Sequence, residues 1–179
     1  MTVKIIDTDA SINLFETMKC FDCIPFFADY RTVITNIVHD EIHAGTSYCD
    51  LDFEMHDMTP DETDLFEDIS RYIYQLGRGE RSAMVHALFL SNQTTDNIVV
   101  ISNDKEAYQV FHRLVLKDPD LKKRFPNMCL IKWVRTYDAI RRMWEKGLLR
   151  NGLAEEIYSE MSRLLGEKNL RFLLEEPEI

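Results

Sequence analysis

The sequence has no apolar stretch approaching the ~20 residues that a membrane-spanning helix needs. It also has no internal repeat, low-complexity tract or Gly/Ser-rich linker. We therefore expect no membrane partner and find no sharp domain boundary. Residues 1–4 lead directly into a strand-like run without a secretory signal, so a cytoplasmic protein is expected. With 179 residues, 45% apolar and 29% charged, the chain fits one globular domain with a short appendage.

Basic residues are scarce, since 21 Lys and Arg face 31 Asp and Glu and the net charge is −10. This total argues against nucleic acid as a partner, but the charge is unevenly distributed. Residues 105–150 carry twelve basic and five acidic side chains, a net of +7, whereas residues 50–68 hold nine acids and no Lys or Arg. A basic region beside an acidic site is compatible with binding a phosphate backbone, and a solvated helix face is the alternative. The candidate phosphate-binding residues are Lys117, Lys122, Lys123, Arg124, Arg141 and Arg142.

Cysteine is rare as well, with four residues, and in a cytoplasmic protein these are expected to be reduced thiols. Cys20 and Cys23, followed by His39 and His43, match the spacing of a Cys₂His₂ zinc site. Against this interpretation, the residues between them are expected to form a core strand and a helix rather than a small zinc finger. No second pair reinforces the motif. A zinc-binding adaptor using these four residues stays open as a minor alternative.

Hydrophobic periodicity predicts strands that alternate with helices. Strands are expected at 3–6, 32–34, 98–101 and 129–131, and helices at 11–19, 24–28, 36–43, 59–76, 80–90, 104–116, 137–146, 153–165 and 167–174. Residues 45–58 are expected to form an irregular acidic loop. Thr59, Pro60 and Glu62 form the capping-box start signal of the helix that follows this loop.

This alternation indicates an α/β fold with a mostly parallel sheet covered on both faces. Residues 1–150 are expected to form the main domain. Residues 151–179 are expected to be a C-terminal helical extension that ends in an acidic tail. These final helices are also candidates for a homo-oligomer contact.

Four acidic residues lie where predicted strands are followed by helices: Asp7, Glu41, Glu80 and Asp104. Carboxylates at the C-terminal ends of parallel strands point into the crevice where open α/β sheets keep their sites. Oxygen ligands of this kind suit Mg²⁺ or Mn²⁺, and a cluster of four acids is costly to fold unless cations bind. Taken singly, each acid has a structural explanation as a helix cap, a favourable charge at a helix N-terminus or a surface charge. Together they predict metal-dependent phosphoryl transfer.

Five segments in sequence resemble the PIN-domain ribonucleases. Residues 5–10 (IIDTDA) look like the opening Asp-Thr motif of that family, and residues 38–41 (VHDE) are similar to its second acidic position. Residues 77–83 (GRGERSA) resemble the Gly-x-Gly-Glu segment of one branch, and residues 100–105 (VISNDK) resemble the Thr-Asn-Asp segment. Residues 129–149 resemble the last strand and helix of that branch. The resemblance covers residues 3 to about 150 in the family's order and spacing.

The resemblance implies a three-layer α/β/α PIN-like fold and an endoribonuclease that hydrolyses RNA with Mg²⁺ or Mn²⁺. It implies RNA as a partner and, for toxin-like members, an antitoxin-like protein. Asp9 replaces the small polar residue that is more usual beside the family's first acid. The acidic stretch 50–68 and the helices after residue 150 are longer than a minimal toxin would have. The alternative is a non-catalytic PIN-fold module that binds RNA or protein. We expect Asp7, Glu41, Glu80 and Asp104 to be the catalytic metal ligands, directly or through water, with Asp9, Ser102 and Asn103 orienting ligands or substrate.

Overall fold

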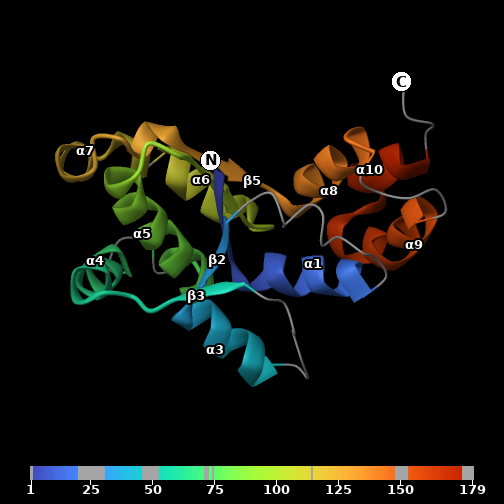
Figure 1. The fold of residues 1–179 in the computed structure, drawn as a ribbon, viewed down its shortest axis with the longest axis horizontal. Helices are drawn as coiled ribbons and strands as arrows, with labels where there is room; N and C mark the ends of the chain where they lie inside the picture. The colour runs from blue at the N-terminus through green and yellow to red at the C-terminus, as the bar shows by residue number, and fades with distance from the viewer. Residues whose placement is uncertain are drawn as a thin grey trace.

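The computed structural model describes residues 2–19, 31–45, 53–70, 73, 75–113, 115–147 and 153–174. Its centre is a five-stranded, fully parallel sheet in the order β3-β2-β1-β4-β5 (Figure 1). The strands are β1 (Thr2–Ile6), β2 (Arg31–Thr35), β3 (Glu54–His56), β4 (Asn97–Ile101) and β5 (Ile131–Val134). The predicted α/β class with a parallel sheet is confirmed.

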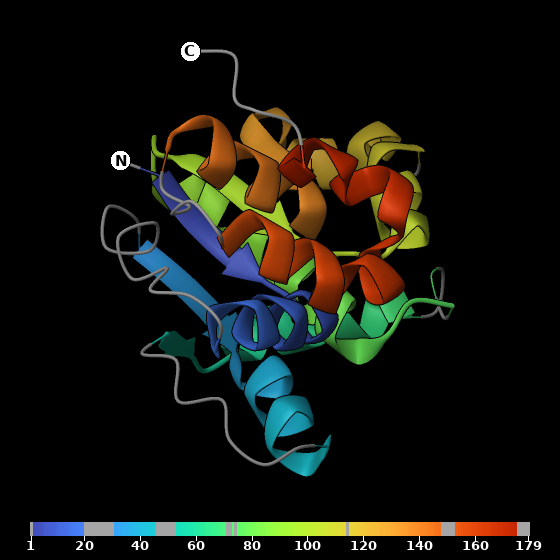
Figure 2. The same ribbon diagram turned by 90° about the vertical axis from the view of Figure 1, so that its right-hand side faces the viewer.

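Helices cover both faces of the sheet and complete a three-layer α/β/α arrangement (Figures 1 and 2). The helices are α1 (Thr8–Lys19), α3 (Asn36–Gly45), α4 (Pro60–Ser70), α5 (Arg78–Gln93), α6 (Lys105–Arg113), α7 (Pro119–Arg124), α8 (Thr136–Glu145), α9 (Leu153–Leu165) and α10 (Glu167–Leu170). Three short 3-10 helices are η1 (Val115–Lys117), η2 (Met128–Leu130) and η3 (Arg171–Leu174). One hydrophobic core joins α4, α5 and α6 to one face of the sheet, and a second joins α1, α3, α8 and α9 to the other.

The central strand β1 explains how both cores form from one short segment. Val3 and Ile5 belong to the first core and Ile6 to the second, as the alternation of side chains along a strand requires. Backbone pairing continues past the strand ends, because the Asp7 amide donates to the Ile101 carbonyl at 3.1 Å. The chain segments that follow β1 and β4 therefore leave the sheet side by side, at the C-terminal ends of these strands.

Two strands differ from the sequence-based expectation. Within the expected loop 45–58, Glu54–His56 forms the edge strand β3, parallel to β2, and the Arg31 guanidinium pairs with the Glu54 carboxylate beside it. The strand was missed because it has three residues and two of them are exposed. Strand β5 begins at Ile131 rather than at 129, since the preceding residues form η2.

The helix predictions are confirmed in outline and shifted at their ends. The capping box is present: the Thr59 amide donates to Glu62 Oε2 at 2.8 Å, and the Glu62 amide donates to Thr59 Oγ1 at 3.3 Å. The helix expected at 104–116 ends at Arg113, and α7 was not predicted although Asp118 caps it ahead of a proline. The helical piece expected at 24–28 lies outside the described residues.

The expected C-terminal helices are present as α9, α10 and η3. Ile157, Met161 and Leu170 are almost fully buried in the same core as Ala10 and Ile140. The C-terminal segment therefore extends the hydrophobic core that covers the second face of the sheet (Figure 2). Within the described segments, no helix combines the length and apolarity that crossing a bilayer requires.

Candidate metal centre

Asp7 is fully buried, with 0% of its surface exposed. The Ala10 amide donates to its Oδ1 at 2.7 Å, so this oxygen caps the start of α1. Its Oδ2 is buried without a hydrogen-bond partner. Burial raises the pKa of Asp7 to about 8; the Ser102 side chain and the Ala10 amide oppose this rise, and the charges of Glu80 and Asp9 add to it. A buried carboxylate oxygen without a donor is a site where a cation would be stabilised.

Glu80 lies in the first turn of α5, just after the chain passes Gly77 and Gly79. Burial raises its pKa, and the charges of Asp9, Asp104 and Glu41 raise it further. A Cβ at Gly77 would overlap the Glu80 carboxylate, so the glycine leaves space that this side chain occupies. Glu80 therefore shares one negative electrostatic environment with acids from α1, α3 and the β4–α6 junction.

Glu41 reaches the same region from α3. The Thr8 hydroxyl donates to Glu41 Oε2, which joins the start of α1 to α3. A Cβ at Gly79 would collide with the Thr8 side chain and lie 2.9 Å from Glu41 Oε2. Thr8, Glu41 and Gly79 are thus in close contact, although more than seventy residues separate the first from the last.

Asp104 and its neighbours form the fourth side of the cluster. The Glu106 and Ala107 amides donate to Asp104 Oδ1 at 2.6 and 3.2 Å, so Asp104 caps α6. Ser102 is fully buried, and its Oγ accepts the Asp104 amide at 3.1 Å. Asn103 Oδ1 accepts the Thr136 amide at 3.2 Å, which ties this loop to the start of α8. Ser102 and Asn103 therefore orient the loop that carries Asp104.

Glu80 lies close enough to Glu41, Asp104 and the exposed Asp9 for their charges to raise its pKa, and Asp7 lies close enough to Glu80 and Asp9 for theirs to do the same. Among the described residues, no three of these acids bring ligand oxygens within 4.8 Å of one another. The donor set consists of hard oxygens, Asp7 Oδ2 lacks a partner, and glycines allow close backbone approach. These features fit Mg²⁺ or Mn²⁺.

The predicted phosphate-binding residues do not form one group. Helix α7 carries three of them and α8 carries two; in Figure 1, α7 lies at the left end of the molecule and α8 on the right-hand side of the sheet. Several also have other contacts: the Arg124 guanidinium lies 5.3 Å from the ring centres of Phe89 and Phe125, and Arg141 Nε lies 3.0 Å from Glu145 Oε1. A single track along all six residues is therefore not the arrangement that the fold presents.

A basic cavity is lined by Lys105, the residue that directly follows Asp104. It has a volume of about 410 Å³. Its lining combines cations with aromatic rings: Lys105, Tyr108, Gln109, His112, Arg113, Trp133, Arg135 and Asp138. Tyr108 is 40% exposed, so part of its ring is accessible to a ligand. Lys105, Arg113 and Arg135 belong to the basic segment 105–150 but are not among the predicted phosphate-binding residues.

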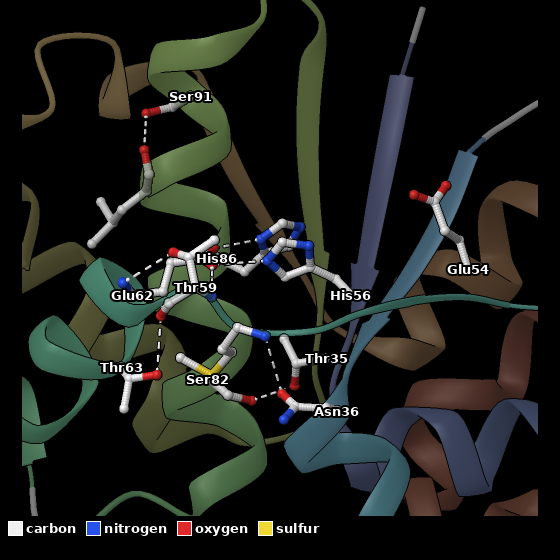
Figure 3. A network of polar contacts seen from close by, with 12 residues as sticks. Thr35, Asn36, Glu54, His56, Thr59, Glu62, Thr63, Ser82, His86 and Ser91 are labelled. Atoms are coloured by element: carbon white, nitrogen blue, oxygen red, sulfur yellow. Dashed lines mark hydrogen bonds and ion pairs between the residues drawn. The ribbon is translucent and has the colours of Figure 1, made fainter.

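A second cluster of metal-ligand residue types was missed from the sequence. His56, Glu62 and His86 come from β3, α4 and α5, and one donor atom of each lies within 4.8 Å of the others (Figure 3). Glu62 had been recognised only as part of the capping box. Of the predicted zinc-binding set, Cys20 and Cys23 lie outside the described residues, while the rings of His39 and His43 lie 4.2 Å apart on α3.

Comparisons of this chain with protein-family models, with curated proteins and with solved structures find no match.

Proposed function

We propose that this protein is a divalent-metal-dependent endoribonuclease of the PIN-like kind, with Mg²⁺ or Mn²⁺ at the acidic cluster. The observation that carries the proposal is the buried Asp7 carboxylate, whose Oδ2 lacks a hydrogen-bond partner beside other acids. A structural carboxylate in such a position would normally be paired or replaced, because an isolated buried charge is costly. A cation bound next to the Asp7 carboxylate removes that cost.

Asp7, Glu41, Glu80 and Asp104 are the residues that would hold the metal, directly or through water. Bound there, Mg²⁺ or Mn²⁺ supplies charge neutralisation for a phosphate group and activation of a water for attack. The chain itself keeps its carboxylates in position. Asp7 and Asp104 are fixed by helix-capping hydrogen bonds, and Glu41 is fixed by the Thr8 hydroxyl.

The basic cavity beside Lys105 supports RNA as the substrate. Lys105 and Arg113 supply positive charge for phosphates, together with Arg135, whose Nε lies 3.4 Å from Asp138 Oδ2, and the partly exposed Tyr108 supplies a ring face for a base. Stacking on aromatic rings combined with a cationic groove is the usual way in which proteins hold single-stranded nucleic acid. Because Lys105 directly follows Asp104, a strand bound in the cavity would pass close to the acidic cluster. We therefore expect single-stranded RNA to be cleaved.

The proposal is tested by incubating single-stranded and duplex RNA with purified protein in Mg²⁺, Mn²⁺ or excess chelator. Cleavage is expected with either metal, with loss of activity in chelator and in Asp7→Asn. Glu67→Gln, which changes an exposed carboxylate on α4, is the matched control and should cleave normally. Cleavage that persists in chelator would refute the metal assignment. RNA binding that is equal with and without metal, and never followed by cleavage, would favour the non-catalytic module.

A further inference from the structure

His56, Glu62 and His86 form a compact, shielded group of nitrogen and oxygen donors. His56 Nε2 lies 2.9 Å from Glu62 Oε2, and His86 Nδ1 lies 2.9 Å from Glu62 Oε1. The two imidazole rings stack with their centres 3.8 Å apart, and Figure 3 shows both rings directed at the one carboxylate. His86 lies six residues beyond Glu80 on α5, or roughly 9 Å along the helix, so this group is separate from the acidic cluster.

We propose that His56, Glu62 and His86 bind one Zn²⁺ ion that joins β3, α4 and α5. Two imidazoles and one carboxylate form a donor set that zinc commonly adopts. Mg²⁺ and Mn²⁺ prefer oxygen ligands, so the nitrogen donors distinguish this site from the acidic cluster. The proposal rests on the described donors alone and does not depend on the proposed nuclease activity.

The spacing of the donors is close to what zinc requires. Zinc bonds of about 2.0–2.1 Å in tetrahedral geometry place neighbouring ligand atoms about 3.3 Å apart. Each imidazole nitrogen lies 2.9 Å from a different oxygen of Glu62, so each of these separations must widen by only a few tenths of an ångström, and one donor atom of each residue lies within 4.8 Å of the others. The His56 side chain is 27% exposed, which gives an ion a route to the site and gives the imidazole room to adjust.

The surroundings of Glu62 favour a bound cation. The residue is 2% exposed, and its described hydrogen-bond partners are the two imidazoles together with the backbone and hydroxyl of Thr59. The Thr59 amide at 2.8 Å fixes the carboxylate, as partners of metal ligands commonly do. The carboxylate is therefore held in a fixed position beside both imidazoles, as a metal ligand requires.

The location explains what the ion would contribute. Strand β3 has three residues and lies at the edge of the sheet, so its backbone pairing alone is a weak attachment. A zinc ion would connect this strand to the middle of α5, the helix whose first turn carries Glu80. The zinc ion would therefore hold β3, α4 and α5 together. Removal of the ion should destabilise β3 and α4 before it affects the rest of the sheet.

The test measures zinc bound to the full-length chain in an Asp7→Asn background, which weakens competing binding at the acidic cluster. The protein is loaded with zinc, desalted, analysed for metal content and titrated against a chromophoric chelator. One equivalent of zinc is expected. In His56→Asn, affinity should fall by more than the roughly 10–100-fold that loss of an outer partner causes. His39→Asn, which alters a more exposed imidazole on α3, is the control and should retain the ion.

Cobalt substitution of the same background protein gives a second measurement that needs no further variant. Co²⁺ bound by imidazole and carboxylate should show visible d–d bands without sulfur charge-transfer bands. Thiolate bands, or loss of zinc in His39→Asn, would overturn the proposal in favour of the site with Cys20 and Cys23. Absence of stoichiometric zinc, or equal zinc in His56→Asn, would also overturn it.

Discussion

Replacement of Asp7 by Asn should stabilise the metal-free protein at neutral pH. Burial raises the pKa of Asp7 to about 8 from an ordinary value of 3.8. Between these two pH values the folded chain holds one proton that the unfolded chain releases, so stability is greatest below pH 3.8 and falls as pH rises toward 8. Asn has no proton to lose and keeps an oxygen that accepts the Ala10 amide. The variant should therefore lack this pH dependence.

The size of the effect follows from the same linkage. Stability should fall by about 1.4 kcal/mol per pH unit across the window, which accumulates to about 4 kcal/mol at pH 7. Solvent does not screen the Asp7 charge, because the side chain is completely buried. Relaxation of the surrounding acids would lower the figure, so about 4 kcal/mol is the upper limit. Below the unfolded pKa the two proteins should be nearly equal in stability.

The assay is urea unfolding of wild type and Asp7→Asn in excess chelator, repeated from pH 3.5 to 8.5. Glu67→Gln provides the control for removal of an exposed charge and should follow the wild type. Added Mn²⁺ should then raise the stability of the wild type and have much less effect on Asp7→Asn, because only the wild type keeps the full ligand set. Equal stability of wild type and Asp7→Asn at every pH would refute the argument that ionisation of the buried Asp7 carboxylate destabilises the metal-free fold.

Three further outcomes are expected. Reversing Lys105 and Arg135 to Glu should reduce the log–log salt slope of RNA binding by about 1.4, since each phosphate on a single strand contributes about 0.7; reversing the two arginines of α8 should change it less, and an equal change would place the RNA elsewhere. Gly79→Ala gains about 1 kcal/mol of helix propensity but collides with Thr8, a cost of roughly 1–3 kcal/mol, so denaturant titration should show a net loss. Ile157→Ala should cost about 2–5 kcal/mol in the same titration because α9 belongs to the core, and a cost under 1 kcal/mol would contradict that packing.

The sequence predicted that the acids lie at the C-terminal ends of the strands, because local signals identify where those strands end. Apolar runs identify β1 and β4, and the residues that follow parallel strands must emerge together. Asp7 and Asp104 could therefore be placed without any knowledge of tertiary contacts. The Gly-x-Gly-Glu segment was likewise visible, although the reason for its glycines was not: one leaves room for Glu80 and the other for Thr8.

The His56, Glu62 and His86 cluster could not be predicted in the same way. Each residue has a sufficient local explanation, since Glu62 completes a capping box and His86 lies on the inner face of α5. The three meet only because β3 pairs with β2 and brings His56 over α4. That pairing involves a short polar strand with no hydrophobic alternation, so its position depends on tertiary contacts rather than on the local pattern.

The helix caps and the metal centre are compatible uses of the same carboxylates, and one variant series can separate them. Asp104 Oδ1 accepts two amides at the start of α6, so the capping role needs an oxygen but not a charge. Asp104→Asn keeps an acceptor and should preserve stability within about 0.5 kcal/mol, while metal-dependent cleavage is lost. Asp104→Ala removes the cap as well and should cost about 1 kcal/mol more. Urea unfolding and the cleavage assay on both variants check this order. If Asp104→Asn still cleaved RNA and Asp104→Ala did not, the carboxylate would serve only as a helix cap. The metal centre would then have to lie elsewhere.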